Sequence, residues 1–271
     1  MPAKMRNPLI RHGMGLAFAS ACLSAVACDP SSTTRTTTPV DSAAITGRLT
    51  ARVTSPPTGT VPTGLTVQTL TAGGRPFGLY VPTTYDPARN WPVTVLLHGE
   101  NGSGEGMVLD FKDDAEAQGV VVLAPNSASS IWDLILNSQF GVDRTYIDDM
   151  LKWAFAHVAA DPARVSISGF SYGGTYALWL GLKNGDLFSR IAAFTPCSAV
   201  PSIRTGLPSL FISHATDDQV APVATCSRVT VASLDSAGYT VDYVEYAALA
   251  GNGHVLTPAV RTQGMVFLAH Q

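Results

Sequence analysis

Apolar and polar positions along the chain predict strands and helices in regular alternation. Within residues 65–81 two alternating runs flank Gly73 and Gly74, which predicts an antiparallel hairpin. The run from Val93 to Leu97 is continuously apolar, as expected of a strand that helices cover on both faces. Later segments alternate in the same way. The pattern predicts a mainly parallel sheet with helices on both faces and the hairpin at one edge.

The expected elements can be placed by residue number. Strands are predicted at 65–70, 77–81, 93–97, 120–124, 165–170, 191–194, 210–213 and 241–246. Helices are predicted from about 104 to 117 and at 147–158, 172–182, 222–237 and 257–269, with an irregular stretch at 126–141.

One serine lies at a turn between a predicted strand and a predicted helix. Ser171 is flanked by Gly169 and Gly173, which lack the Cβ atoms that would clash if neighbouring backbone packed closely. A serine hydroxyl becomes a useful nucleophile when it is exposed, has a base beside it, and has donors for the oxyanion. The segment predicts a nucleophile, and the alternative is a glycine-rich turn with a structural serine.

Candidate partners for Ser171 are sought downstream of it, in the order nucleophile, acid, base. His254 and His270 then remain as bases, and His270 is next to last in the sequence, where fraying is expected. His254 follows the last predicted strand in a glycine-containing loop and is the predicted base. Asp217 and Asp218 directly follow another strand, and loop position does not choose between them.

The oxyanion would need two backbone donors. The N–H groups of Tyr172 and Glu100 are predicted for this role, because each follows the end of a buried strand. Trp132 is predicted to contact the substrate. His98 and His214 also end strands, but no close-spaced histidine pair exists, so neither a metal nor a cofactor is expected.

The first 27 residues have the character of an export signal. A basic start is followed by an apolar stretch and by small residues before Cys28. The stretch resembles a bacterial lipoprotein signal, although Ala25 replaces the usual leucine, so lipidation of Cys28 and plain secretion both stay open. Removal of Lys4, Arg6 and Arg11 would change the formal net charge from −3 to −6. No basic stripe that would bind nucleic acid remains.

Residues 28–64 are rich in Ser, Thr and Pro and are predicted to form a disordered tether before a catalytic domain at 65–271. Within that domain the cysteines are Cys197 and Cys226. In an oxidising compartment they are candidates for a disulfide, and two buried free thiols are the alternative.

With these features placed, residues 65–271 resemble the α/β-hydrolase superfamily. The closest likeness is to bacterial esterases related to the phospholipase/carboxylesterases, feruloyl esterases and polyhydroxybutyrate depolymerases. The likeness rests on four motifs, at residues 96–99, 168–174, 182–188 and 214–222. In such enzymes the acid stands four residues after a histidine, which here implies Asp218. Only 11 residues, 197–207, occupy the usual place of a lid, which implies an open site without a large lid.

The sequence therefore predicts an exported serine esterase, secreted or held at the cell envelope through a lipid on Cys28. Ser171, His254 and Asp218 would act through an acyl-enzyme on short or medium acyl or aromatic esters. A first alternative is a polyester depolymerase or feruloyl-type esterase, with Trp132 contacting the polymer. A second is an envelope binding protein that keeps the fold without catalysis.

Overall fold

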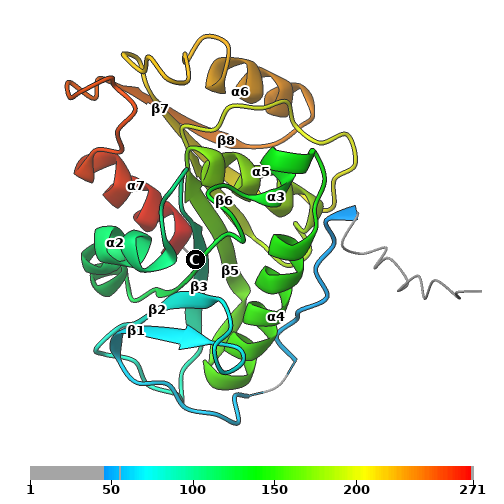
Figure 1. The fold of residues 1–271 in the computed structure, drawn as a ribbon, viewed down its shortest axis with the longest axis vertical. Coiled ribbons are helices and arrows are strands. Elements are labelled where there is room, and N and C mark those ends of the chain that lie inside the picture. Colours follow the sequence, from blue (N-terminus) through cyan, green and yellow to red (C-terminus); the bar gives the residue numbers. More distant parts are fainter. Residues whose placement is uncertain (1–45, 55, 270–271) are drawn as a thin grey trace, which may run out of the picture. The chain divides into compact units, whose positions relative to one another are not determined.

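The computed structural model describes residues 46–54 and 56–269, and these form one mixed sheet with helices on both faces (Figure 1). The sheet has eight strands in the order β1-β2-β4-β3-β5-β6-β7-β8. Their bounds are β1 Gly64–Thr69, β2 Pro76–Val81, β3 Trp91–Leu97, β4 Val121–Pro125, β5 Ala160–Phe170, β6 Arg190–Phe194, β7 Ser209–Ala215 and β8 Val241–Tyr246.

Only β2 runs opposite to the other seven strands of the sheet. β1 pairs with β2 and β2 with β4 in antiparallel fashion, whereas every pairing from β4 through β8 is parallel. The predicted hairpin is confirmed with Gly64 opposite Val81. Because parallel strands end at the same edge, the loops after β3, β5, β6 and β7 gather on one side of the sheet.

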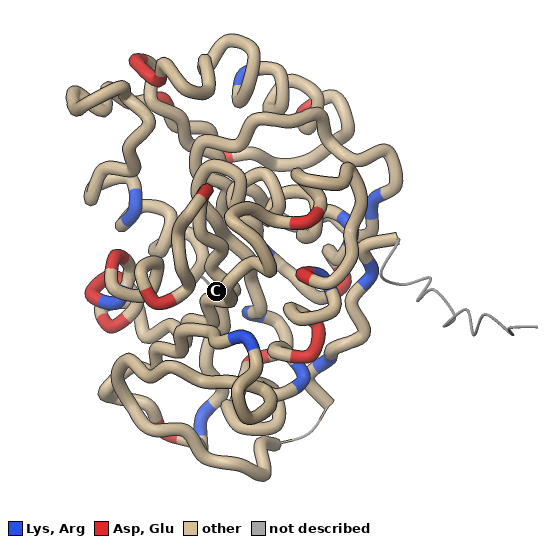
Figure 2. Tube along the Cα trace, in the orientation of Figure 1, with Lys and Arg blue, Asp and Glu red and all other residues tan. Residues whose placement is uncertain are grey.

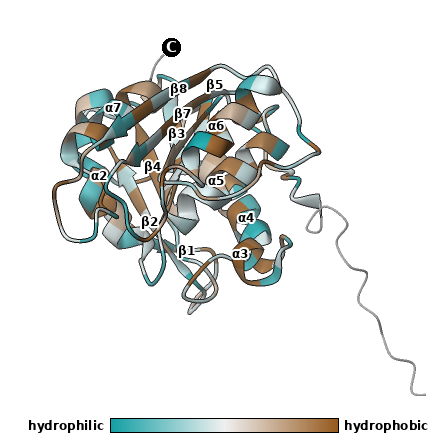
Figure 3. Cartoon of the chain, turned by 90° about the horizontal axis from the view of Figure 1, so that it is seen from above, coloured by the Kyte–Doolittle hydropathy of each residue, from teal (hydrophilic) through white to brown (hydrophobic). Residues whose placement is uncertain are grey.

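Two layers of helices cover the sheet. The helices are α2 Gly104–Gln118, α3 Asp133–Asn137, α4 Val142–His157, α5 Tyr172–Lys183, α6 Ser227–Ser236 and α7 Pro258–Ala269. Side chains of α2 and α7 share one apolar cluster, and those of α4, α5 and α6 share the other. Figure 3 shows the apolar strands between these layers.

Central strands supply both clusters. Val121 and Leu123 of β4 face one layer, while Val122 and Ala124 face the other, so the whole strand is buried. This explains the continuous apolar runs in the sequence and confirms the predicted mainly parallel sheet with helices on both faces. The structure differs locally from the prediction. Helix α3 interrupts the stretch predicted to be irregular, α4 begins at Val142 and not at 147, β5 begins at Ala160 and not at 165, and α6 begins at Ser227 and not at 222.

The predicted tether is wrong at its C-terminal end. Leu49 and Ala51 are 2% and 1% exposed and belong to the core cluster that also contains residues of α4 and α5. The backbone N–H groups of Thr50 and Ala51 donate to the Asp148 carboxylate over 2.7 and 2.8 Å. Composition suggested disorder because aliphatic residues are few here, but two of them and several hydrogen bonds suffice to fix the segment.

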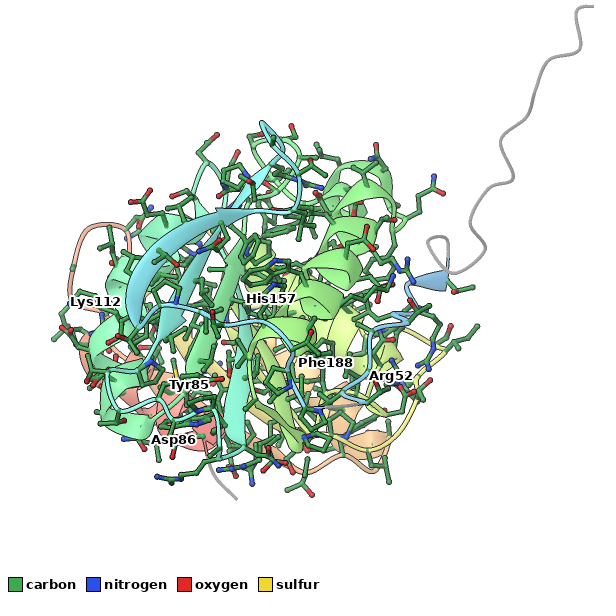
Figure 4. The ribbon with its side chains drawn as sticks, turned by 90° about the horizontal axis from the view of Figure 1, so that it is seen from below. Arg52, Tyr85, Asp86, Lys112, His157 and Phe188 are labelled. Carbon is green, nitrogen blue, oxygen red and sulfur yellow. A yellow bond between two sulfur atoms is a disulfide. The ribbon has the colours of Figure 1, made fainter. Side chains whose placement is uncertain are left out.

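Ion pairs reinforce this attachment. Arg48 and Arg52 both bind Asp186, over 2.7 and 2.6 Å, and the hydrogen bond from Arg48 is the main cause that lowers the pKa of Asp186 to about 2. Figure 4 labels Arg52 on this N-terminal segment. The expected export signal at 1–27, Cys28 and the tether up to residue 45 lie outside the described residues. None of the helices within 46–54 and 56–269 combines the length and apolar character needed to cross a bilayer.

Candidate active site

A cavity of about 710 Å³ lies beyond the carboxyl ends of the parallel strands. Ser171 and His254 both line it, together with the loops that follow β3, β6 and β7. This is the position at which parallel α/β sheets usually bind their ligands. The cavity therefore contains the predicted nucleophile and the predicted base.

Ser171 occupies the turn between β5 and α5 with φ of 56° and ψ of −123°. Few residues other than glycine adopt such a conformation, and it persists only where the surroundings enforce it. The Ser171 N–H donates to Phe194 O over 2.9 Å, and the Thr175 N–H donates to Ser171 O over the same distance. These bonds fix the turn to strand β6 and to the first turn of α5.

Neither of the two flanking glycines has room for a side chain. A Cβ on Gly173 would lie 2.3 Å from Leu97 O, and a Cβ on Gly169 would lie 2.4 Å from the Gly173 carbonyl carbon. Real Cβ atoms do not approach backbone so closely. The predicted reason for these glycines, close packing of neighbouring backbone, is confirmed.

Ser171, His254 and Asp218 form a chain of hydrogen bonds. Ser171 Oγ lies 2.9 Å from His254 Nε2, and His254 Nδ1 lies 2.7 Å from Asp218 Oδ2. A carboxylate only accepts, so Nδ1 carries the proton and Nε2 is left to accept from the serine hydroxyl. The geometry is that of a nucleophile, a base and an orienting acid.

Asp218 is itself held on all sides. Its side chain is buried, and Oδ1 accepts from the N–H groups of Val220 and Ala221, each over 2.8 Å. His214 lies behind it, with Nε2 2.7 Å from Ala221 O and Nδ1 2.5 Å from Ser227 Oγ. Burial lowers the pKa of His214, so its ring stays neutral and ties the acid loop to α6.

Asp217, the other candidate acid, has a different position. Its two carboxylate oxygens accept from the N–H groups of Ala248 and Leu249, over 2.8 and 3.0 Å. These residues belong to the loop that carries His254. Asp217 therefore holds the backbone of this loop, while Asp218 accepts the hydrogen bond from the His254 imidazole.

The predicted oxyanion donors both line the cavity. Within the described chain, neither the Glu100 N–H nor the Tyr172 N–H donates to a protein acceptor. Tyr172 opens α5, where the first backbone donors have no partner inside the helix. Both groups are thus available to a ligand at Ser171.

His98 fixes the turn that carries Glu100. The Ser127 N–H donates to His98 Nε2 over 3.0 Å, so Nε2 is an acceptor and Nδ1 carries the proton. Nδ1 then donates to Gly99 O over 2.6 Å. Burial lowers the pKa of His98, which agrees with this neutral form.

The prediction that Trp132 contacts substrate is wrong. Its side chain is 0% exposed and lies outside the cavity lining. Trp132 Nε1 donates to His98 O over 2.8 Å, and the ring packs against the His98 ring at 4.9 Å between centroids. Trp132 supports the turn before Glu100 from behind. The residues around Trp132 follow no periodic apolar pattern, so the sequence did not indicate that this side chain is buried.

Cys197 and Cys226 are joined by a disulfide. Cys197 follows β6 and Cys226 precedes α6, and both line the cavity. The bond therefore links two of the loops that form the cavity wall. Within 46–54 and 56–269, His, Cys, Asp and Glu side chains form no group of three or more that could hold a metal ion.

Two further lining residues were not singled out in the sequence. Phe170 packs against the His254 ring at 5.1 Å between centroids, and Asp110 on α2 lines the cavity. Phe170 could have been suspected from its place beside Ser171. Asp110 carried no signal, because its position depends on how α2 packs against the sheet.

Relatives of known structure share this architecture. A thermostable esterase aligns with a TM-score of 0.56 at 22% identity, over 76% of this chain and 60% of that chain. A fluorophosphonate-binding serine hydrolase of Staphylococcus aureus aligns with a TM-score of 0.60 at 11% identity, over 78% of this chain and 100% of that one. At these identities the likeness establishes the fold.

Sequence comparison gives a closer assignment. The chain is 29% identical over 182 residues to an acetylxylan esterase of Coprinopsis cinerea, across 56% of this chain and 48% of that protein. The chain thus matches about half the length of this curated relative. The Esterase family model, described as "Putative esterase", matches residues 71–229, which include Ser171 and Asp218. Because this match spans more than half of the sequence, the chain belongs to the Esterase family, and its fold is that of the α/β-hydrolases.

Proposed function

We propose that the chain hydrolyses carboxylic esters through an acyl-enzyme formed on Ser171. The observation that carries the proposal is the continuous hydrogen-bonded chain from Asp218 through His254 to Ser171 Oγ, at the wall of an open cavity. Family membership supports the reaction class.

In the first step, His254 Nε2 takes the hydroxyl proton while Ser171 Oγ attacks the ester carbonyl carbon. The oxygen that becomes negative is stabilised by the Glu100 and Tyr172 N–H groups. His254 then gives the proton to the leaving alkoxide, and the alcohol departs. Water, activated by the same imidazole, adds to the acyl carbon and releases the acid and free Ser171. Asp218 keeps Nδ1 protonated and stabilises the imidazolium.

A fluorophosphonate probe tests this proposal. It is expected to label the protein once, at Ser171, and labelling should vanish in Ser171→Ala and fall at least about 10³-fold in rate in His254→Ala. Peptide mapping locates the adduct. Labelling at another residue, or none in a folded protein, would contradict the proposal and favour a binding protein on the same fold.

We propose short acyl esters as substrates, with acetyl esters of a polysaccharide as the candidate polymer. The similarity to an acetylxylan esterase favours this choice. The described residues 197–207, which join the end of β6 to β7, are too short for a large lid, so a chain lying across the cavity could reach Ser171. Acetate release from acetylated xylan, compared with release from p-nitrophenyl acetate, tests it. Turnover of the small ester alone would restrict the function to soluble esters.

We also propose that the chain is exported and cleaved before Cys28. The support is the basic, apolar and small-residue pattern of residues 1–27. Mass spectrometry of protein recovered from a bacterial host gives the first residue and shows whether Cys28 carries lipid. A mature chain that retains residues 1–27 would contradict export with cleavage.

A further inference from the structure

The ionisable side chains that line the main cavity carry an uneven charge. Its lining includes the carboxylates Glu100 and Asp110 and the imidazoles His98 and His254, and none of the lysines and arginines that the structure describes lines it. His98 is held neutral by the Ser127 N–H, and His254 is the base described above. The two exposed carboxylates therefore dominate the field in the cavity.

Neither carboxylate is compensated within the described residues. Glu100 and Asp110 make no ion pair and no side-chain hydrogen bond in that part of the chain. Two other carboxylates, both on α2, do form ion pairs. Asp113 pairs with Lys112 and Asp114 pairs with Arg261, each over 2.6 Å. Figure 2 shows the acidic residues concentrated along α2.

Besides the N-terminus of α5, whose Tyr172 N–H is assigned to the oxyanion, two positive features lie nearby, and both are already occupied. Arg261 lines an adjoining cavity of about 280 Å³, but its guanidinium binds Asp114. The N-terminus of α2 carries a partial positive charge. Its Gly104 N–H donates to Asn126 Oδ1 over 2.6 Å, and its Gly106 N–H donates to Ser103 Oγ over 3.1 Å.

We infer that the cavity selects esters without a negative charge near the scissile bond, and that Glu100 and Asp110 set this selectivity. The inference rests on the proposed ester hydrolysis. An anionic group brought into the cavity meets uncompensated like charge, whereas a neutral group does not and a cationic group is attracted. Hydrolysis of a neutral ester by water gives an alcohol, a carboxylate and a proton, so the same field favours departure of the carboxylate product.

The size of the effect follows from Coulomb's law. Two unit charges about 8 Å apart at an effective dielectric constant of about 40 change an equilibrium about fivefold. Two carboxylates together are expected to disfavour an anionic ester by roughly 10- to 30-fold at low ionic strength. Salt at about 0.5 M should remove most of this difference, because both groups are exposed.

Three acetate esters of similar shape test the inference: 4-acetoxybenzoate, 4-acetoxyacetophenone and 4-acetoxy-N,N,N-trimethylanilinium. Each kcat/KM is divided by the hydroxide-catalysed rate of the same ester. The neutral ester is expected to exceed the anionic one by the factor given above, with the cationic ester equal or better. The ratio of the normalised kcat/KM for the neutral ester to that for the anionic ester should fall about fivefold in Glu100→Gln and about fivefold in Asp110→Asn.

Asp235→Asn is the matched control, since Asp235 is an exposed carboxylate on α6 that does not line the cavity. It should leave the ratio unchanged. Equal normalised rates for the anionic and neutral esters would overturn the selectivity, as would equal narrowing by the control. Both results require an active enzyme, so they are distinct from failure of the proposed reaction, in which no ester turns over and no probe binds.

Discussion

Ser171 and His254 lie within hydrogen-bonding distance, yet the two segments that carry them are held by different means. The Ser171 turn is fixed by close packing: Gly169 and Gly173 leave no room for a side chain, and the turn is pinned to β6. The His254 loop is fixed mainly by hydrogen bonds to Asp217, with one close backbone contact at Gly253, where a Cβ would lie 2.0 Å from Asp217 O. Leu249 in that loop is 87% exposed and has a φ of 56°. The turn that carries the nucleophile is thus held mainly by backbone packing against the sheet, whereas the loop that carries the base is held mainly by hydrogen bonds.

The largest expected effect comes from removing the nucleophile. Ser171→Ala should lower kcat/KM for p-nitrophenyl esters by at least about 10⁴-fold, because no covalent intermediate can form. Its thermal unfolding should change little, since the Ser171 hydroxyl forms a hydrogen bond only with His254 among the residues that the structure describes. Steady-state kinetics and calorimetry measure the two effects. Residual activity within about 10-fold of the wild type would remove Ser171 from the mechanism.

Glycine substitutions separate the two kinds of attachment. Gly173→Ala should cost about 3 kcal/mol or more in the free energy of unfolding, because its Cβ would meet Leu97 O at 2.3 Å. Gly251→Ala, in the loop before His254, is the matched control: its φ is 56° but nothing lies within 4 Å of the added Cβ. It should cost about 1 kcal/mol. Urea unfolding gives both values, and equal costs would contradict the comparison.

Asp217→Ala should affect activity more than stability. Losing the two acceptors for Ala248 and Leu249 frees the loop, and kcat/KM is expected to fall about 10-fold as His254 samples unproductive positions. Asp217→Asn, which keeps one acceptor oxygen, should fall between this variant and the wild type. Asp242→Asn, an exposed change on β8, is the control and should leave kcat/KM unaltered. Full activity in Asp217→Ala would show that the loop keeps its conformation without the hydrogen bonds to Asp217.

As the pH is lowered, the His254 loop should become more mobile at a higher pH than the Ser171 turn does. The Ala248 and Leu249 N–H groups lower the pKa of Asp217 below its ordinary value of about 3.9. Ionised Asp217 therefore stabilises the loop above about pH 4, and this contribution is lost as pH falls through the lowered pKa. Hydrogen exchange of the Ala248 and Leu249 amides should accelerate there, relative to the Thr175 amide. In Asp217→Ala the acid dependence should be absent.

The same contrast explains what could be predicted from the sequence. The Ser171 turn was predictable because packing requires glycines at fixed spacing between a strand and a helix. His254 was placed by its loop and by chain order. Asp218 was separated from Asp217 only through a family motif, because both carboxylates follow β7 and their partners, Ala248 and His254, are distant in sequence.

Features that depend on tertiary packing were missed or misjudged. Trp132 was expected at the surface of the site, and its burial follows from contacts with His98 and Tyr176, which lie far away in the sequence. Asp110 faces the cavity only because α2 packs where it does. A disulfide between Cys197 and Cys226 could be proposed from their places after predicted strands, but their distance depends on the packing of β6 beside β7.

The attachment of residues 46–54 has a practical consequence for dissecting the protein. A shortened chain starting at Leu65, where the first predicted strand begins, would lose Leu49 and Ala51 from the core. It would also leave the buried carboxylate of Asp148 without its Thr50 and Ala51 donors, and the Asn184 side chain without its Leu49 donor. The smallest autonomous folding unit therefore begins no later than about Arg48, well upstream of the first strand.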